Sequence, residues 1–259
     1  MERVYEPEFY DLLTKESLNG DAEWYRRKAK ECGGPVLELG CGTGRIAIPM
    51  AQDGAVVYAL DADAEMLAAL QRKAATLPEE VQKRIVTVIG DMRSFVLEER
   101  FALIISPFRA FLHNLTTEDQ LACLHKVHQH LRPGGRVAFN VFHPSLEFMA
   151  QCAGALAGVW RCTGNFSLND GGLALRSESN RYDTVRQRVV SLQRYELYGA
   201  DGNLKRTFLQ RLELAYLYPA DLRRLLTESG FDQIEIAGGF DGRPLMNDQD
   251  ELVIEAVRN

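Results

Sequence analysis

PVLELGCGTG, residues 35–44, is the stretch that decides the fold of this chain. Val36, Leu37 and Leu39 predict a short buried strand, and the apolar residues after Gly44 fit the inner face of a helix. The glycines between them predict a tight turn, because glycine adopts positive φ and lets the backbone approach a ligand closely. The free N–H groups of the following helix would face that ligand. The stretch therefore predicts a strand, a glycine turn and a helix beside a nucleotide-like ligand.

The spacing of the glycines distinguishes between nucleotides. A dinucleotide fold needs G-x-G-x-x-G/A, and here Arg45 occupies the third small position. Glu38 stands two residues before the first glycine, where its carboxylate would repel a pyrophosphate and suits a ligand with a positive charge. An NAD-linked oxidoreductase is therefore the less favoured alternative. A glycine turn with no ligand is the other alternative that this motif alone leaves open.

The motif ELGCGTG at 38–44 resembles the first motif of the class I S-adenosylmethionine-dependent methyltransferases. In that family the loop wraps the methionine end of a cationic sulfonium cofactor. The resemblance covers residues 36–142 and, more loosely, 218–257. It implies S-adenosyl-L-methionine as cofactor and a small-molecule methyltransferase as the type of protein.

Composition limits the classes of partner. The 259 residues suffice for one domain with a full core, or for one domain with an insertion. A net charge of -6 argues against binding to a phosphate backbone, so we expect no nucleic-acid partner. No window approaches the ~18 to 20 apolar residues of a membrane span, and the acidic N-terminus does not resemble a signal peptide. We therefore expect a cytoplasmic protein without a membrane partner.

Cysteines and histidines give no metal site. The five cysteines include no C-x-x-C pair and are odd in number, so we expect small buried side chains rather than disulfides or zinc ligands. His125, His128 and His130 fall on one predicted helix, but no third ligand is evident nearby. We expect these three histidines on a solvated face.

Apolar runs after the glycine turn continue the alternation of strands and helices. The expected further strands are 55–60, 85–89, 101–106, 136–142, 231–237 and 251–257. Residues 1–31 are expected to form two helices, the second ending at Gly33 and Gly34. The pattern predicts a doubly wound, seven-stranded, mostly parallel α/β sheet of Rossmann-like type whose last strand is antiparallel.

The alternation of strands and helices stops between residues 145 and 217. Three runs of alternating character, 173–184, 187–198 and 204–217, predict an antiparallel sheet with a hairpin signal at 199–203. We expect this sheet to be inserted into a core formed by 1–144 and 218–259. In similar small-molecule methyltransferases such an insertion is a lid over the acceptor pocket and often a dimer surface, so a monomer or a homodimer is expected.

Acidic residues follow successive strands at the edge where ligands of such sheets bind. Asp61 comes about 20 residues after the glycine loop and can accept hydrogen bonds from ribose hydroxyls, while Asp63 is expected to cap the next helix. The resemblance places Ala62 and Met66 beside the adenine. It implies that the Asp91 carboxylate accepts a hydrogen bond from the adenine amine. It also places Tyr10, on an N-terminal lid helix, near the methionine end, with simple packing as the alternative. The expected cofactor-binding residues are Tyr10, Glu38, Gly40, Cys41, Gly42, Gly44, Asp61, Ala62, Met66, Asp91, Met92, Ser106 and Phe108.

His113 is the candidate catalytic residue, because it follows the fourth strand at the ligand edge. His143 and Tyr182 are alternatives, and a hydrogen bond to cofactor or backbone is the alternative role for His113. A base is needed only when the acceptor carries a proton that must leave; alignment of the acceptor is the main requirement. Four arginines could orient an anionic acceptor, although a plain surface arginine is the favoured alternative for each: Arg109, Arg181, Arg186 and Arg243.

The expected reaction is methyl transfer to an N, O or C nucleophile of a small-molecule acceptor. SPFR, residues 106–109, lacks the second proline of the D/N/S-P-P-Y/F signature of enzymes that methylate base amines. A non-catalytic protein that binds S-adenosylmethionine for regulation is the main alternative, because the binding motifs do not separate it from an enzyme.

Overall fold

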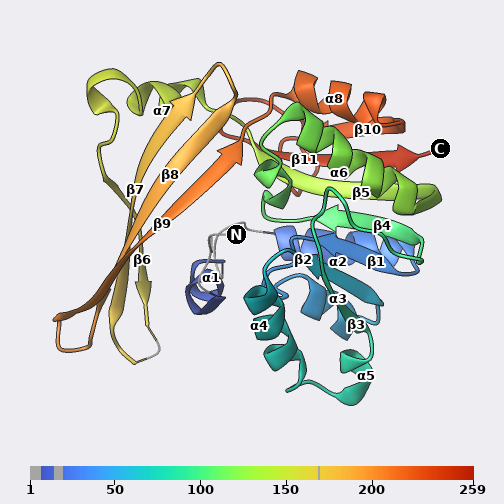
Figure 1. The fold of residues 1–259 in the computed structure, drawn as a ribbon, viewed down its shortest axis with the longest axis horizontal. Coiled ribbons are helices and arrows are strands. Elements are labelled where there is room, and N and C mark those ends of the chain that lie inside the picture. Colours follow the sequence, from blue (N-terminus) through green and yellow to red (C-terminus); the bar gives the residue numbers. More distant parts are fainter. Residues whose placement is uncertain (1–6, 15–19, 169) are drawn as a thin grey trace.

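A computed structural model places residues 7–14, 20–168 and 170–259 in a central seven-stranded sheet with helices on both faces and a separate four-stranded sheet (Figure 1). Residues 1–6 and 15–19, which belong to the expected N-terminal helices, lie outside these described ranges.

The central sheet has the order β10-β11-β5-β4-β1-β2-β3. Its strands are β1 Val36–Leu39, β2 Val57–Asp61, β3 Ile85–Ile89, β4 Phe101–Ser106, β5 Leu131–Phe142, β10 Phe231–Ala237 and β11 Glu251–Arg258. β11 runs antiparallel to both of its neighbours, β10 and β5, while the pairs among β1 to β5 are parallel. The expected fold class is confirmed.

The helices and 3-10 turns connect these strands in chain order. They are α1 Pro7–Thr14, α2 Asp21–Cys32, α3 Ala47–Gln52, α4 Ala64–Ala74, α5 Glu79–Gln82, η1 Ala110–His113, α6 Thr117–His130, α7 Leu146–Gln151, η2 Gly154–Leu156 and α8 Pro219–Glu228. The Asp63 side chain accepts a hydrogen bond from the Glu65 N–H, so the predicted cap of α4 is confirmed. The short α5 was not expected from the sequence.

Strand residues alternate between two hydrophobic layers. Leu37 and Leu39 point toward α6 and α8, whereas Val36 points toward α2, α3 and α4. Each side chain of β1 is buried, as expected for the centre of a sheet covered on both faces. This burial fixes the position of the glycine turn that follows Leu39.

The inserted sheet has four antiparallel strands in the order β6-β7-β8-β9. They are β6 Arg161–Ser167, β7 Leu173–Asp183, β8 Arg188–Tyr198 and β9 Leu204–Ala215. Three strands were expected; β6, RCTGNFS, was missed because it has no clear alternation of apolar and polar residues. Figure 1 shows this sheet beside the core, with α1 between it and α4. The Arg188 guanidinium donates to the Leu115 carbonyl, which ties β8 to the loop after η1.

The expectation of a solvated face for the three histidines of α6 is wrong for His130. Its ring is 4% exposed and packs 4.5 Å from the ring of Phe95, and its Nε2 accepts a hydrogen bond from the Leu97 N–H at 3.1 Å. His130 stands three residues after Val127, on the same buried face of the helix. His128 also packs its ring against Phe231, and only His125 of the three is exposed.

None of the helices in the described ranges is both long and apolar enough to cross a membrane.

Candidate functional site

A cavity of about 520 Å³ lies at the carboxyl ends of β1, β2, β3 and β4. Open α/β sheets bind their ligands at this edge. Its lining is Tyr10, Gly40, Gly42, Leu60, Asp61, Ala62, Asp63, Ala64, Glu65, Met66, Gly90, Asp91, Met92, Arg93, Pro107, Phe108, Ala110, His113 and Asn114. The cavity therefore brings together nine of the thirteen expected cofactor residues with His113.

The glycine turn forms one wall of the cavity. Gly40 and Gly42 both have positive φ, and a Cβ at Gly40 would stand 2.8 Å from the Ala110 Cβ. At Gly42 a Cβ would stand 3.3 Å from the Tyr10 ring. Gly44 does not line the cavity; a Cβ there would stand 2.8 Å from Leu70 Cγ, so this glycine lets the turn pack against α4.

Three further predicted residues lie behind the glycine turn rather than in the cavity lining: Glu38, Cys41 and Ser106. The Ser106 hydroxyl donates to the Leu39 carbonyl at 3.4 Å, and the Cys41 thiol donates to the Gly42 carbonyl at 3.8 Å. Both side chains are buried. These two residues support the strand ends, and direct contact with a ligand is not indicated by their positions.

Glu38 is a buried carboxyl with an unused acceptor. Its side chain receives a hydrogen bond from the Ala47 N–H, but Oε2 has no hydrogen-bond partner among the described residues. Burial raises the pKa of Glu38 to about 8, opposed by the nearby Arg45 guanidinium. A positively charged ligand would favour the ionised form of this carboxyl, whereas a pyrophosphate would oppose it.

Asp61 links the second strand to the glycine turn. Its Oδ2 accepts from the Gly42 N–H at 2.7 Å, and its Oδ1 accepts from the Asp63 N–H at 2.9 Å. Burial raises the pKa of Asp61, and these backbone donors oppose the shift. Each carboxylate oxygen retains a lone pair, so the group can still accept hydrogen bonds from hydroxyls of a ligand.

Asp91 shares its carboxylate with a residue that the sequence reasoning missed. The Arg93 guanidinium contacts Asp91 at 2.5 Å and also reaches Asp119 at 2.9 Å. This hydrogen bonding lowers the pKa of Asp91. Arg93 follows the G-D-M motif directly, and that adjacency was the available signal. An adenine amine at Asp91 would add to this ion pair rather than meet a free carboxylate.

The opposite wall is the segment from Pro107 to Asn114. The Phe108 ring lies edge-on to the Tyr10 ring at 6.0 Å, and the Arg45 guanidinium lies 5.2 Å from its centre. Helix α1 closes this corner. The Thr43 hydroxyl donates to Asp11, and Lys73 pairs with Asp11 at 2.6 Å. Tyr10 is thereby held over the glycine turn.

His113 is the one candidate base that lines the cavity. It ends η1, and burial lowers the pKa of its imidazole to about 4, so the ring is uncharged at neutral pH. His143 packs edge-on to Tyr218 at 6.2 Å, and its Nδ1 is buried without a hydrogen-bond partner in the described ranges. Tyr182 packs against Tyr216 and Phe148, and burial raises its pKa. Neither of these two reaches the cavity lining.

Three of the four arginines proposed to orient an acceptor are already in ion pairs. Arg109 pairs with Glu251 at 2.7 Å, Arg186 with Asp183 at 2.9 Å and Arg243 with Asp250 at 2.9 Å. The Arg109 side chain also lies over the Phe142 ring at 5.4 Å. These contacts indicate structural roles for the three side chains.

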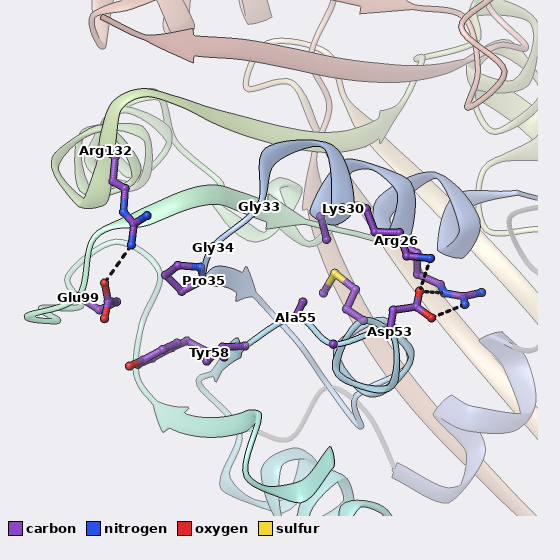
Figure 2. A pocket seen from close by; sticks show the side chains of 14 residues that line it. Arg26, Lys30, Gly33, Gly34, Pro35, Asp53, Ala55, Tyr58, Glu99 and Arg132 are labelled. Atoms are coloured by element: carbon purple, nitrogen blue, oxygen red, sulfur yellow. Dashed lines mark hydrogen bonds and ion pairs between the residues drawn. The ribbon is translucent and has the colours of Figure 1, made fainter. Parts of the chain in front are cut away.

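A second hollow, of about 490 Å³, lies at the amino ends of the strands. Figure 2 shows two ion pairs on opposite sides of this hollow, Arg132 with Glu99 and Arg26 with Asp53, and Tyr58 below them. This edge is the one at which doubly wound sheets do not bind their ligands. The larger cavity at the carboxyl edge is therefore the candidate site.

Comparison with known proteins identifies the type of domain that contains this cavity. Residues 36–135 match a family model described as a methyltransferase domain. This part of the chain is therefore a methyltransferase domain, and the similar proteins include S-adenosylmethionine-dependent methyltransferases. The matched residues include β1, the glycine turn and every strand end that borders the cavity.

Three similar proteins extend the comparison. The chain is 29% identical over 140 residues to the cypemycin N-terminal methyltransferase of Streptomyces sp, a match that covers 53% of this chain and 55% of the relative. The chain spans about half the length of the first curated relatives that it matches. The glycopeptide N-methyltransferase MtfA, solved with S-adenosylmethionine, is 26% identical with a TM-score of 0.57, covering 95% of this chain and 99% of MtfA. CalS10, an amino pentose methyltransferase from Micromonospora echinaspora, shares the fold, with a TM-score of 0.71 at 20% identity over 100% of both chains.

The cavity fits S-adenosyl-L-methionine, the molecule with which a similar methyltransferase was solved. The unpaired Oε2 of Glu38 suits a cation nearby, and Gly40 and Gly42 leave room that a Cβ would fill. Residues that would hold it are Tyr10, Gly40, Gly42, Asp61, Met66 and Asp91. Sequence reasoning did not single out Ala110 and Asn114, although both follow the Pro107-Phe108 motif closely.

Proposed function

We propose that this chain transfers a methyl group from S-adenosylmethionine to an amine nitrogen of a small molecule. The observation that carries this proposal is the uncharged imidazole of His113 in the cavity lining, with the buried carboxyl of Glu38, behind the glycine turn, suited to a cationic cofactor. When bound, S-adenosylmethionine supplies a methyl group that is already activated by its sulfonium.

His113 orients the acceptor rather than ionising it. A neutral imidazole accepts a hydrogen bond from an amine N–H and so directs the nitrogen lone pair. Because the pKa of His113 is about 4, the imidazole is too weak a base to remove the proton of an ammonium group. The acceptor therefore reacts as a free amine, and the rate rises with pH through the acceptor's own pKa.

The named relatives support an amine acceptor. The curated relative is named for N-terminal methylation, MtfA is named as an N-methyltransferase, and CalS10 is described as acting on an amino pentose. Oxygen and carbon nucleophiles are the competing acceptors, and they would need a stronger base than His113 when their proton must leave.

The inserted sheet is the proposed acceptor lid. We assign residues 145–217 to this lid and residues 1–144 and 218–259 to the cofactor-binding core. Support comes from the hydrogen bond between Arg188 and the Leu115 carbonyl, which brings β8 within two residues of His113. The lid can also be the surface of a homodimer.

The test is a methyl-transfer screen with S-adenosylhomocysteine as readout. Amino sugars and peptides with a free N-terminus are compared with matched hydroxyl and phenol acceptors. We expect turnover with amines alone. His113→Ala should lower kcat by about 10- to 100-fold, in the range of a lost orienting hydrogen bond, whereas replacement of the exposed His125 by Ala should leave kcat unchanged.

Other outcomes separate the alternatives. Full turnover in His113→Ala would remove its catalytic role. Binding of S-adenosylhomocysteine without turnover on any acceptor would favour a regulatory protein that binds the cofactor. Tight NAD binding without binding of S-adenosylmethionine would indicate an oxidoreductase.

A further inference from the structure

Two consecutive residues in the cavity wall have a backbone conformation that side chains oppose. Phe108 has φ 54° and Arg109 has φ 65°. Among the described residues only Gln187 and Gln233 are further non-glycine residues with positive φ. Such a conformation persists only when the surrounding structure holds it. Phe108 lines the cavity directly, so whatever holds this turn also holds the wall.

Side chains from two distant strands hold the turn. The Phe108 N–H donates to Asn140 Oδ1 at 3.0 Å. The Arg109 guanidinium makes two parallel hydrogen bonds to Glu251, at 3.0 Å and 2.7 Å. Asn140 Nδ2 donates to Glu251 Oε1 at 2.6 Å, so the two holding groups are themselves joined. We call Asn140 and Glu251 together the clamp.

The clamp is rigid and enclosed. Asn140 is fully buried in β5, and the Glu251 side chain is only 13% exposed at the start of β11. Asn140 pairs in register with Val253, which places Glu251 on the same face of the sheet. The hydroxyl of the buried Tyr25, on α2, donates to Asn140 Oδ1 at 2.8 Å. Paired and enclosed hydrogen bonds of this kind are strong and geometrically specific.

The position of the turn determines where three parts of the site lie. It carries the Phe108 ring against Tyr10, it places Ala110 in contact range of Gly40, and it starts the η1 turn that ends at His113. Neither Asn140 nor Glu251 belongs to the cavity lining.

We propose that Asn140 and Glu251 are positioning residues, which hold the Phe108-Arg109 turn in the one conformation that forms the cavity wall and places His113. They set the affinity for the cofactor and the alignment of His113 from outside the cavity. The identity of the ligand rests on the proposed function, but the clamping of residues 107–114 does not.

The first test compares the same substitution at two carboxylates of β11. Glu251→Gln is the probe and Glu255→Gln the control, because the Glu255 side chain is 14% exposed and pairs with two cations, Lys28 at 2.8 Å and Arg136 at 3.7 Å. The measurements are amide hydrogen exchange of residues 107–114 without ligand and the Kd for S-adenosylhomocysteine. We expect Glu251→Gln to speed exchange and to raise the Kd by about tenfold or more, the size of effect of a lost charge-assisted pair. Glu255→Gln should change both less than twofold. Equal behaviour of the two variants would overturn the proposal.

The second test isolates the backbone strain at Arg109. Arg109→Gly and Arg109→Ala lose the same guanidinium, but glycine adopts positive φ without a Cβ penalty. If the clamp opposes strain in the turn, Arg109→Gly binds S-adenosylhomocysteine several-fold more tightly than Arg109→Ala. Amide hydrogens of residues 107–114 should also exchange more slowly in Arg109→Gly than in Arg109→Ala. Equal values, or tighter binding by Arg109→Ala, would show that the guanidinium acts in some other way.

Turnover separates this inference from the proposed function. A wild-type protein that binds S-adenosylhomocysteine but methylates no acceptor refutes the proposed function and leaves the clamp to be judged by exchange and binding. If the wild type does not bind, hydrogen exchange of 107–114 in the four variants still decides the inference.

Discussion

Two turns meet across the cavity, and both need positive φ. The glycine turn at 40–44 meets this need with residues that have no side chain, so each position tolerates the conformation locally. The turn at Phe108 and Arg109 keeps its side chains and relies on Asn140 and Glu251. The first solution leaves a contiguous motif in the sequence. The second is spread over residues 108 to 251, and its parts meet only after the sheet has formed.

Of the substitutions that test this difference between the two turns, Gly40→Ala should have the largest effect on stability and binding. Alanine would be strained at φ 71°, and its Cβ would stand 2.8 Å from the Ala110 Cβ, so the two turns would be forced apart. We expect a loss of roughly 4 kcal/mol in the free energy of unfolding from strain and overpacking together. Urea denaturation measures this loss, and calorimetric titration should show no binding of S-adenosylhomocysteine.

Gly54→Ala is the control for Gly40→Ala. Gly54 also has positive φ, at 103°, but nothing lies within 4 Å of an added Cβ. Strain alone predicts a loss of about 1 to 2 kcal/mol without loss of binding. Equal effects of the two substitutions would mean that contact between the turns does not matter.

Glu38→Gln tests the charge beneath the glycine turn. The pKa of Glu38 is raised from 4.5 to about 8 in the folded protein, so its contribution to stability is complete below pH 4.5 and is lost as pH rises through 8. Stability of the wild type should therefore fall by roughly 3.5 kcal/mol relative to Glu38→Gln between pH 5 and pH 8. Urea denaturation at several pH values measures the difference. Parallel pH profiles would show that Glu38 ionises normally.

Tyr25→Phe tests the support behind the other turn. It removes the hydrogen bond to Asn140 Oδ1, which still accepts from the Phe108 N–H, so we expect a loss of about 1 kcal/mol. Tyr195→Phe is the matched control, because its buried hydroxyl donates to Gln193 at 2.8 Å in the inserted sheet. Both should lower the melting temperature similarly. Only Tyr25→Phe should speed hydrogen exchange at 107–114, and an unchanged pattern there would separate Tyr25 from the clamp.

Asp11→Asn should have the smallest effect, because side chains support the glycine turn only at its surface. Asp11 pairs with Lys73 and accepts from Thr43, and its side chain is 33% exposed. We expect less than about 1 kcal/mol of lost stability. Dissociation of S-adenosylhomocysteine, followed by stopped flow, should be a few-fold faster as α1 loosens. The exposed pair of Glu79 with Lys83 gives the control, Glu79→Gln, for which no change in dissociation is expected.

The sequence predicted the elements that depend on local patterns. β1 to β4 follow short apolar runs, and the Asp63 cap follows from a short oxygen side chain before a helix. β6 was missed because RCTGNFS has no alternation to read. His130 was misplaced because the three histidines of this helix were assigned to one solvated face, whereas the spacing of His130 from Val127 indicated burial.

The residues of the candidate site also fall into those that local sequence patterns predict and those that they do not. Residues at strand ends, such as Asp61 and Asp91, were predicted because parallel strands deliver their carboxyl ends to one edge. The roles of Asn140 and Glu251 were not, since they depend on the register of β5 with β11, which no local pattern reveals. The ion pair of Arg109, which the sequence left as a possible acceptor ligand or a surface side chain, could not be predicted because its partner, Glu251, stands 142 residues away.

The chain leaves the core at His143 and returns at Tyr218, and the rings of these two residues lie 6.2 Å apart. A segment whose two ends are this close can be lengthened, shortened or exchanged at little entropic cost to the remainder of the domain. The core and the inserted sheet are thus free to diverge at different rates during evolution. On the proposed assignment of the inserted sheet as the acceptor lid, changes between these two residues alter the acceptor pocket and leave the glycine turn and the clamp as they are.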